Sequence, residues 1–324
     1  MSTRILIIGA GIVGHAAGKG FIKKGFDVTF VDNNPKVVQK LKEEGLDIYY
    51  PYQINSQSAE ISMFCINTPS KSNGNINLNH LKSAIKNHAR WLKNNKNHEY
   101  HVVVIRSTVP PGTTNDLVLP LLEKYSGMIA GRDFGLCMQP EFLRSHSSEN
   151  DFLNPRITVI GEFDKQSGDV LEKLYADRFE GQIFRVDLKT AEFMKYVHNC
   201  FNAAKISFSN EMWLIGEKLG IKDPNLALKL ATISAEGYWN PEYGTVGGFP
   251  YAGHCLPKDS RAFLSFVRKA RVDASLLSAT VKINSKVEEL VNKQIQGQKQ
   301  KQKQQQTKPE KRINNSLRQV PMIN

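Results

Sequence analysis

The apolar residues of the first half of the chain fall into short runs that are separated by segments of helical periodicity. Five runs have the length and apolar content of buried parallel strands, at 5–8, 26–31, 61–66, 101–105 and 134–138. Two shorter runs, at 156–160 and 183–186, have the same character. Helical segments lie between the runs, for example at 36–44 and 78–92. The pattern therefore predicts a doubly wound, Rossmann-type α/β sheet over residues 1–187.

From residue 188 onward the pattern is wholly helical. Apolar spacing predicts a long helix at 190–219 and shorter ones at 225–234, 258–268 and 276–295, with a loop rich in Gly, Pro and aromatic residues at 237–253. Residues 188–295 are therefore expected to form a helical central domain. Residues 296–324 are rich in Gln and Lys and poor in apolar residues, so we expect a disordered tail there.

The charge of the chain is concentrated in that tail. The formal net charge is +12, and seven basic residues against one acidic residue follow Gln296, so the tail contributes about half of the excess. A mildly basic body suits an anionic small-molecule ligand. The tail alone supports no more than weak, nonspecific phosphate binding, so we expect no nucleic-acid partner.

The four cysteines, Cys65, Cys137, Cys200 and Cys255, are widely scattered. The absence of a CxxC pair argues against a disulfide framework and a zinc site, and no metal is expected. The sequence shows neither the apolar region of a signal peptide nor an apolar run long enough to span a membrane. We therefore expect a cytoplasmic protein without a membrane partner. Cys65 and Cys137 lie inside predicted strands and are expected in the core.

A glycine-rich turn follows the first strand. The segment Gly9-Ala10-Gly11-Ile12-Val13-Gly14 stands between a strand and a helix, and the next strand ends at Asp32. In this context the three glycines permit the turn, the approach of a pyrophosphate and close helix packing, while the acid accepts hydrogen bonds from ribose hydroxyls. The pattern predicts a dinucleotide site and favours NAD over NADP, because a carboxylate would repel the extra phosphate.

Polar residues follow the other predicted strands. Thr68, Thr108 and Glu141 stand just after three of them. Ligands of doubly wound sheets bind beyond the carboxyl ends of the strands, so these residues are candidates for the site.

The segment Gly253-His254-Cys255-Leu256-Pro257-Lys258-Asp259 places one thiol on a turn just ahead of a predicted helix. Cysteine reacts as the thiolate, which a helix N-terminus or a nearby ammonium favours. Pro257 suits the first helical turn, and Asp259 stands four residues after the thiol, on its side of the turn. The alternative is that Cys255 is an inert small hydrophobe. His254 adjoins the thiol, but neighbouring side chains do not face each other on a helix.

Lys195 and Asn199 lie four residues apart in the long predicted helix and therefore share one face. Most lysines at such spacing are solvated. The apolar residues around this one, such as Phe193 and Val197, favour a buried, functional lysine.

Together these segments resemble the UDP-glucose/GDP-mannose dehydrogenase family of nucleotide-sugar 6-dehydrogenases, across residues 1 to about 295. The matching pieces occur in family order: Gly9–Gly14 with Asp32, Asn67-Thr68-Pro69, Ser107–Thr113, Pro140–Leu143, Asp151-Phe152, Val159–Gly161, Ala191–Tyr196 with Asn199, Lys205–Phe208, Asn210-Glu211 and Cys255–Asp259. Each piece alone is weak, and the ordered set is highly specific.

The resemblance implies a four-electron oxidation of a sugar CH2OH group to a carboxylate, with two NAD used in turn. It implies that Cys255 forms a thiohemiacetal and then a thioester, and that Lys195 and Asn199 stabilise oxyanions. Asp259 would move protons with Lys195 and a water, and Glu141 and Thr108 would place or activate the hydrolytic water. The cofactor residues expected are Gly9, Gly11, Ile12, Val13, Gly14, Asp32, Thr68, Pro69, Ser107 and Thr108. The substrate residues expected are Phe142, Leu143, Arg144, Lys195, Asn199, Tyr251, Gly253 and Lys258.

The sequence departs from the family pattern in three places. Ser145 stands where a second glutamate is usual, which affects the hydrolytic half of the reaction. The turn before the cysteine is Ala252-Gly253-His254 instead of Gly-Gly-Ser. Where a third, C-terminal domain usually begins, this sequence has the Gln/Lys segment.

These features leave a choice between two functions. The first is an NAD-dependent nucleotide-sugar 6-dehydrogenase, with UDP-glucose ranked first as substrate and a homodimer formed through the central domain. The second is a truncated NAD-binding, dimerising or regulatory module, or one half of a split enzyme whose missing domain is a partner chain. A hydroxyacid or 6-phosphogluconate-type dehydrogenase ranks low because it does not account for the Cys255 segment.

Overall fold

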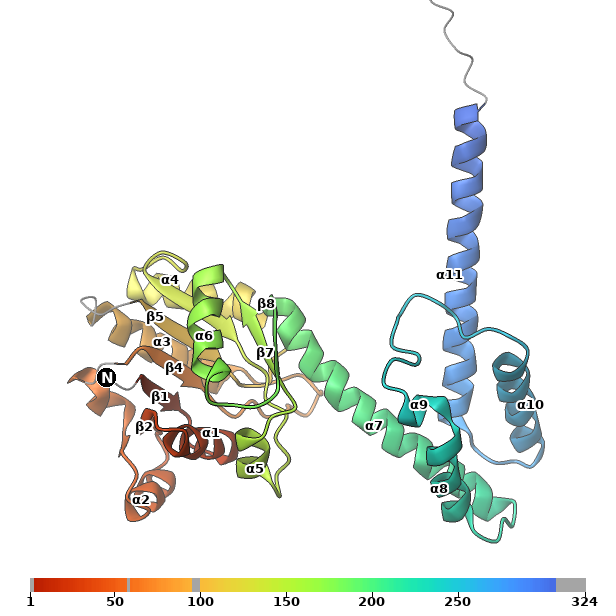
Figure 1. The fold of residues 1–324 in the computed structure, drawn as a ribbon, viewed down its shortest axis with the longest axis horizontal. Coiled ribbons are helices and arrows are strands. Elements are labelled where there is room, and N and C mark those ends of the chain that lie inside the picture. Colours follow the sequence, from red (N-terminus) through yellow and green to blue (C-terminus); the bar gives the residue numbers. More distant parts are fainter. Residues whose placement is uncertain (1–2, 57–58, 95–99, 307–324) are drawn as a thin grey trace, which may run out of the picture. The chain divides into compact units, whose positions relative to one another are not determined.

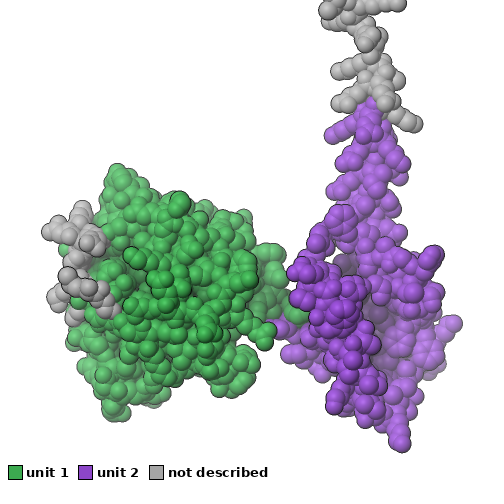
Figure 2. Space-filling view, in the orientation of Figure 1, with its two compact units in different colours: residues 1–201 green, residues 202–324 purple. Residues whose placement is uncertain are grey.

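A computed structural model describes residues 3–56, 59–94 and 100–306 of the 324-residue chain. The chain divides into two compact units, Met1–Phe201 and Asn202–Asn324 (Figure 2). The strands are β1 (Arg4–Ile8), β2 (Asp27–Val31), β3 (Ile48–Tyr49), β4 (Ile61–Phe64), β5 (His101–Ile105), β6 (Phe134–Met138), β7 (Ile157–Glu162) and β8 (Gln182–Asp187). The helices of the first unit are α1 (Ile12–Lys23), α2 (Pro35–Glu43), η1 (Pro51–Ser56), α3 (Asn79–Asn94), η2 (Thr114–Val118), α4 (Leu119–Ser126), α5 (Ser148–Leu153) and α6 (Lys165–Ala176). Helix α7 (Leu188–Lys218) runs through both units, and α8 (Pro224–Ser234), α9 (Glu236–Trp239), α10 (Cys255–Lys269) and α11 (Ser275–Gln306) belong to the second.

The first unit is built on one eight-stranded sheet (Figure 1). Its strand order is β3-β2-β1-β4-β5-β6-β7-β8, and every neighbouring pair is parallel except β6 and β7. The chain leaves β1 for β2 on one side and later returns to β4 on the other side of β1. This reversal opens a crevice at the carboxyl ends of β1 and β4, where doubly wound sheets bind ligands.

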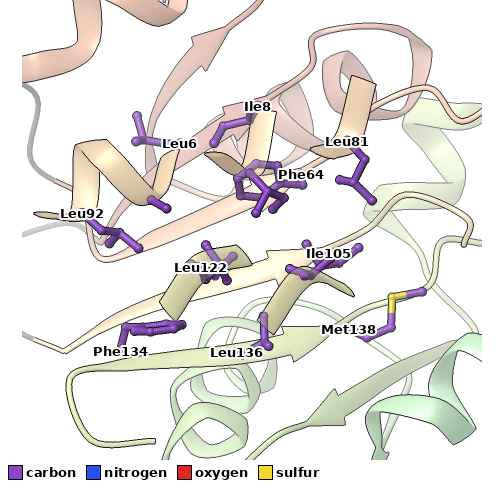
Figure 3. Close-up of a cluster of buried hydrophobic side chains, with 14 of the residues drawn as sticks. Leu6, Ile8, Phe64, Leu81, Leu92, Ile105, Leu122, Phe134, Leu136 and Met138 are labelled. Carbon is purple, nitrogen blue, oxygen red and sulfur yellow. The ribbon is translucent and has the colours of Figure 1, made fainter. Parts of the chain in front are cut away.

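Two hydrophobic clusters cover the two faces of the sheet. Leu6 and Ile8 of β1 point to one face, where α3, α4 and the start of α7 pack, while Ile5 and Ile7 point to the other, where α1, α2, α5 and α6 pack. The alternation follows from the two-residue period of a strand. Figure 3 shows the first cluster, in which Phe64, Phe134 and Met138 lie between strands and helices. Burial on both faces explains why the central strands β1, β4, β5 and β6 are almost continuously apolar.

The second unit has a small core of its own. Ile215 of α7, Leu264 and Val267 of α10 and Ala274 are buried together. Glu211 of α7 accepts hydrogen bonds from the first free N–H groups of α11, those of Leu276 (2.6 Å) and Leu277 (2.9 Å). A carboxylate at this position satisfies backbone N–H groups that have no partner within the helix, and it interacts favourably with the positive end of the helix dipole. Glu211 therefore fixes where α11 begins.

The seven predicted strands and the long predicted helices are confirmed, with shifts of one to three residues at most ends. Helices α4, α5 and α6, the short helices η1 and η2 and the two-residue strand β3 were not predicted. The predicted loop at 237–253 is corrected at its start, where α9 forms. The predicted tail is wrong in its first part, because α11 continues without a break to Gln306. Gln and Lys are good helix formers, and extending an existing helix avoids the cost of nucleation. The rest of the predicted tail, 307–324, lies outside the described residues.

The predicted domain limits of 1–187, 188–295 and 296–324 stay a prediction. The junction of β8 and α7 falls at 187/188, whereas the compact units divide later, after Phe201. Leu188 and Ala191 explain the difference, since these first residues of α7 pack into the core of the sheet. Among the described helices, none combines the length and the apolarity that crossing a membrane requires.

His88 of α3 is a buried histidine in an aromatic environment. Its side chain is 2% exposed, and its ring lies 5.0 Å from Trp91, 5.2 Å from Phe64 and 5.4 Å from His101. Neither ring nitrogen of His88 has a hydrogen-bond partner among the described residues. Burial, with a smaller contribution from His101, holds the pKa of His88 well below its usual range.

His88→Phe is expected to make the protein less sensitive to acid. A lowered pKa means that the unfolded chain binds the proton first, so the wild type is most stable above a pH of about 6.5 and loses stability as the pH falls. The variant should lose up to about 1.4 kcal/mol less per pH unit between pH 6 and 5. Urea unfolding at pH 7.5 and pH 5 measures this, with the exposed His80→Phe as control. An equal acid loss in wild type and His88→Phe would contradict the prediction.

Candidate active site

The glycine-rich turn after β1 is shaped for a close approach. Gly9 has φ +91°, a backbone conformation that residues other than glycine rarely adopt. Its N–H donates a hydrogen bond to the carbonyl oxygen of Val31 at 2.8 Å. A Cβ on Gly14 would lie 1.9 Å from the Gly9 carbonyl oxygen, so this glycine lets α1 approach the turn. A Cβ on Gly11 would meet nothing within 4 Å. Gly11 therefore leaves open space at the N-terminus of α1, where a helix binds phosphate.

Asp32 closes the other side of this turn. Its Oδ2 accepts a hydrogen bond from the N–H of Ala10 at 2.8 Å, and its Oδ1 accepts one from the N–H of Asn34 at 2.8 Å. These bonds hold a carboxylate at the end of β2, beside the glycine turn. The exposed Ile12 and the half-buried Val13 begin α1 next to it. The open space at Gly11, the free helix end and the placed carboxylate fit a dinucleotide with an unmodified ribose.

Two glycine substitutions are expected to separate folding from binding. Gly14→Ala should destabilise the first unit by about 1–3 kcal/mol, because its Cβ would overlap backbone. Gly11→Ala should change stability by less than about 0.5 kcal/mol, because its Cβ points into open space. It should still weaken NAD binding at least about tenfold, since the methyl group takes the space of the ligand. Thermal unfolding and NAD titration test both variants. Unchanged NAD affinity in a folded Gly11→Ala protein would contradict the assignment.

The loops after β4 and β5 are joined to each other. Thr68 donates from Oγ1 to the carbonyl oxygen of Thr108 at 2.7 Å, and Ser107 donates from Oγ to Ile66 O at 2.7 Å. Thr68 and Thr108 are half-buried, whereas Pro69 is exposed. The structure therefore brings the predicted cofactor residues of these two loops together at the carboxyl edge of the sheet.

Lys195 and Glu141 form a buried ion pair. Lys195 Nζ lies 2.8 Å from Glu141 Oε1 and also donates to the Glu141 carbonyl oxygen, with 7% and 12% of the two side chains exposed. The ammonium lies 5.6 Å from the centroid of the Phe142 ring, and Glu141 Oε2 accepts from the N–H of Leu143 at 2.7 Å. The buried lysine was predicted, but its pairing with Glu141 was not. A buried cation held this way is preorganised to stabilise negative charge nearby.

Glu192 is a buried residue of this site that the sequence pattern does not single out. Its carboxylate is fully buried and accepts hydrogen bonds from the N–H groups of Gly112 and, at 2.7 Å, Thr114. Burial raises the pKa of this carboxyl group, against the effect of these bonds. Glu192 thereby ties the loop that begins with Ser107 and Thr108 to helix α7, one turn before Lys195. Its place in the matched segment was a signal, but an acid in a helix is usually solvated.

The remaining predicted residues of the first unit differ in their surroundings. Asn199 lies one turn beyond Lys195 on α7 and is exposed. Arg144 is held by Asp151, with NH2 2.6 Å from Oδ1 and Nε 3.0 Å from Oδ2, so its charge is already paired. Ser145, next to it, is exposed. The ring of His198 lies 4.8 Å from the Phe142 ring and is tilted against it by 40°. Burial together with the charge of Lys195 lowers the pKa of His198.

The second unit carries Cys255 at the start of a helix. Helix α10 begins at Cys255 itself, with His254 as its N-cap, so the predicted helix start near 258 is corrected by one turn. Pro257 does not prevent this, because the first turn of a helix needs no intrahelical N–H bond there. The thiol is exposed. Lys258 and Asp259 pair with each other at 2.7 Å, and both are exposed.

Tyr251 and Gly253 lead into this helix. Tyr251 is half-buried and its hydroxyl group lies 3.3 Å from Ser260 Oγ of α10, while Gly253 has φ +83°. The structure thus groups the predicted residues by unit. Lys195, Glu141, Asn199 and the cofactor residues belong to the first unit. Cys255, Asp259, Lys258 and Tyr251 belong to the second.

The sheet reversal beside β1, the glycine turn and the acid after β2 define a dinucleotide-binding protein of the dehydrogenase class. Two family models match the chain: the UDP-glucose/GDP-mannose dehydrogenase family NAD binding domain over residues 3–56 and 50–179, and the central domain of that family over residues 189–286. The chain therefore belongs to the UDP-glucose/GDP-mannose dehydrogenase family, as its resemblance predicted. Its cofactor is NAD.

Relatives agree with this assignment. The chain is 35% identical over 302 residues to GDP-mannose 6-dehydrogenase of Pseudomonas syringae pv. tomato, a match that covers 87% of this chain and 68% of that protein. It is 32% identical to UDP-glucose 6-dehydrogenase of Rickettsia felis, covering 87% and 64%. A solved ternary complex of GDP-mannose dehydrogenase from Pseudomonas aeruginosa is similar at a TM-score of 0.79 and 32% identity, covering 88% of this chain and 69% of that one.

Proposed function

We propose that this protein oxidises a nucleotide sugar at C6 to the uronic acid, in two successive oxidations. The observation that carries the proposal is the buried pair of Lys195 and Glu141 at the carboxyl edge of a NAD-binding sheet. Dehydrogenases must stabilise an alkoxide as the hydride leaves, and a preorganised ammonium meets that need. The exposed thiol of Cys255 at a helix N-terminus adds the nucleophile that a four-electron oxidation requires.

NAD, when bound, accepts a hydride from the sugar carbon in each oxidation. Gly9, Gly11, Ile12, Val13 and Gly14 would hold its pyrophosphate. Asp32 would hold the ribose, and Thr68, Pro69, Ser107 and Thr108 would line the site at the ends of β4 and β5. The bonds from Thr68 to Thr108 and from Ser107 to Ile66 already join these two loops, so the site needs little reorganisation.

Cys255 acts between the two oxidations. Its thiolate forms a C–S bond to the aldehyde carbon, and the carbonyl electron pair moves to oxygen, where Lys195 and Asn199 stabilise the negative charge. Oxidation of this thiohemiacetal leaves a thioester on Cys255. Water then attacks the thioester carbon, the C–S bond breaks, the thiolate is restored and the carboxylate is released, and the two protons of the water pass to solvent.

Protons and water are handled by the remaining polar residues. Asp259 would move protons together with Lys195, and Glu141 and Thr108 would place the hydrolytic water. The ion pair of Asp259 with Lys258 would have to open for this role. Phe142, Leu143, Tyr251, Gly253 and Lys258 are the proposed substrate contacts. For Arg144 the same role requires release from Asp151.

The second unit suits a homodimer. Large apolar side chains of this unit are exposed in the single chain, including Leu230 (55%), Ile233 (71%), Trp239 (60%) and Phe249 (74%). A second copy that covers them would bury this surface. Light scattering at two protein concentrations distinguishes a dimer from a monomer.

The function is tested by following NADH formation with purified protein, NAD and a panel of nucleotide sugars. GDP-mannose and UDP-glucose come first in the panel. The sequence motifs rank UDP-glucose first, whereas the more similar relatives named above favour GDP-mannose. Two NADH per sugar would support the proposal. NAD binding without turnover of any sugar would overturn it and favour the NAD-binding module or the split enzyme.

A further inference from the structure

Asn284 of α11 is a buried amide that binds the backbone of another segment. Its side chain is 7% exposed. Its Oδ1 accepts a hydrogen bond from the N–H of Tyr251 at 2.7 Å, and its Nδ2 donates one to the carbonyl oxygen of Tyr251 at 3.1 Å. One side chain therefore satisfies both backbone polar groups of a single loop residue, as a neighbouring strand would.

This contact lies four residues before Cys255. The chain passes from Tyr251 through Gly253, which has φ +83° and open space where a Cβ would lie, to the first residue of α10. The hydroxyl group of Tyr251 reaches Ser260 Oγ, one turn into the same helix, at 3.3 Å. The loop end is thus held by its backbone to α11 and by its side chain to α10.

Helix α11 is a firm support for this contact. Its start is fixed by Glu211, which accepts from the N–H groups of Leu276 and Leu277. One turn before Asn284, Val281 packs against the core that Leu264 and Val267 of α10 form. The Asn284 amide therefore anchors the loop to the same core that holds α10, the helix that carries Cys255.

We propose that Asn284 is a positioning residue for the Cys255 thiol. The proposal rests on the proposed function, in which Cys255 is the nucleophile. Without the amide, the N–H and C=O of Tyr251 must find water, and the loop before Cys255 can open. Gly253 offers little resistance, because glycine restrains the backbone least. The thiol then spends less time where a substrate carbon can meet it, and the cost falls on the chemical step.

The test compares Asn284→Ala with Asn292→Ala, an exposed asparagine on the same helix. The first readout is hydrogen exchange of the Tyr251 amide. It should become at least about fivefold faster in Asn284→Ala, since a lost hydrogen bond of ordinary net strength changes an opening equilibrium by about that factor. The second readout is the alkylation rate of Cys255 by iodoacetamide, followed on its peptide, which should change several-fold. Asn292→Ala should alter neither.

Turnover supplies the third readout. In Asn284→Ala, kcat should fall at least about tenfold while the NAD affinity stays unchanged, because NAD binds the first unit. Asn284→Asp, which keeps the acceptor and loses the donor, should lie between wild type and alanine in all three readouts, and it replaces the alanine variant if that protein does not fold.

Unchanged Tyr251 exchange and Cys255 alkylation in a folded variant would overturn the proposal. Equal acceleration of exchange throughout the second unit would also overturn it. Both readouts are independent of turnover, so failure of the dehydrogenase function would be seen separately.

Discussion

Cys255→Ala protein is expected to bind NAD and to form no uronic acid. Without the thiolate, no covalent intermediate links the two oxidations, and net formation of the acid should fall by more than about 10³-fold. NAD affinity and thermal stability should stay close to wild type, because Cys255 is exposed and lies in the second unit. NADH yield per sugar, product analysis and NAD titration measure the three quantities.

The other cysteines serve as controls. Cys200 is the second exposed thiol, and Cys200→Ala should retain full activity. Cys65 and Cys137 are buried, and burial raises the pKa of the Cys65 thiol to about 11 and that of Cys137 further still, so neither can supply a thiolate near neutral pH. Uronic acid formed by Cys255→Ala at more than a tenth of the wild-type rate would exclude the covalent route.

Lys195→Met is expected to cost about 10²–10³ in kcat, the usual effect of removing one oxyanion-stabilising group. It should also lower stability by about 3–5 kcal/mol, because Glu141 is left buried without its counter-ion. Methionine matches the length of the lysine stem, so the lost packing is small. Steady-state kinetics and urea unfolding measure the two effects separately.

A double variant separates the two roles of the lysine. Lys195→Met with Glu141→Leu removes both charges, and replacing a buried ion pair with apolar residues is often neutral for stability. The double variant should therefore recover most of the lost stability and none of the lost activity. Recovery of kcat together with stability would show that Lys195 acts only as a structural partner of Glu141.

Local sequence features were enough for the cofactor half of the protein. A strand, a glycine turn, a helix and an acid occur within the first 32 residues, and the structure places them as that order implies. Each interaction there is local or joins neighbouring strands. Helix α6 was missed although Asp164 caps it by accepting from the N–H of Ser167 at 3.0 Å, because a single acid before a polar segment is a weak signal.

The paired and anchoring residues could not be predicted in the same way. Glu141 and Lys195 are 54 residues apart, and Asn284 and Tyr251 are 33 apart. Periodicity places each of them on an element, but it does not say which elements meet. The sequence therefore indicated a buried lysine, while its partner, and the amide that holds the loop before Cys255, became visible only in three dimensions.

The direction of the last two strands of the sheet, β7 and β8, determines where α7 starts and therefore where Lys195 lies. Strand β7 is antiparallel to β6, and β8 is parallel to β7. Helix α7 therefore starts beside Gly161, where Leu188 and Ala191 pack, and not beyond the carboxyl ends of the parallel strands. Seven residues of helix, roughly 10 Å at 1.5 Å per residue, then carry the ammonium to Glu141. A small residue at 161 lets the helix lie close to the sheet along this path. The direction of these two strands thus sets the path along which α7 brings the Lys195 ammonium to Glu141.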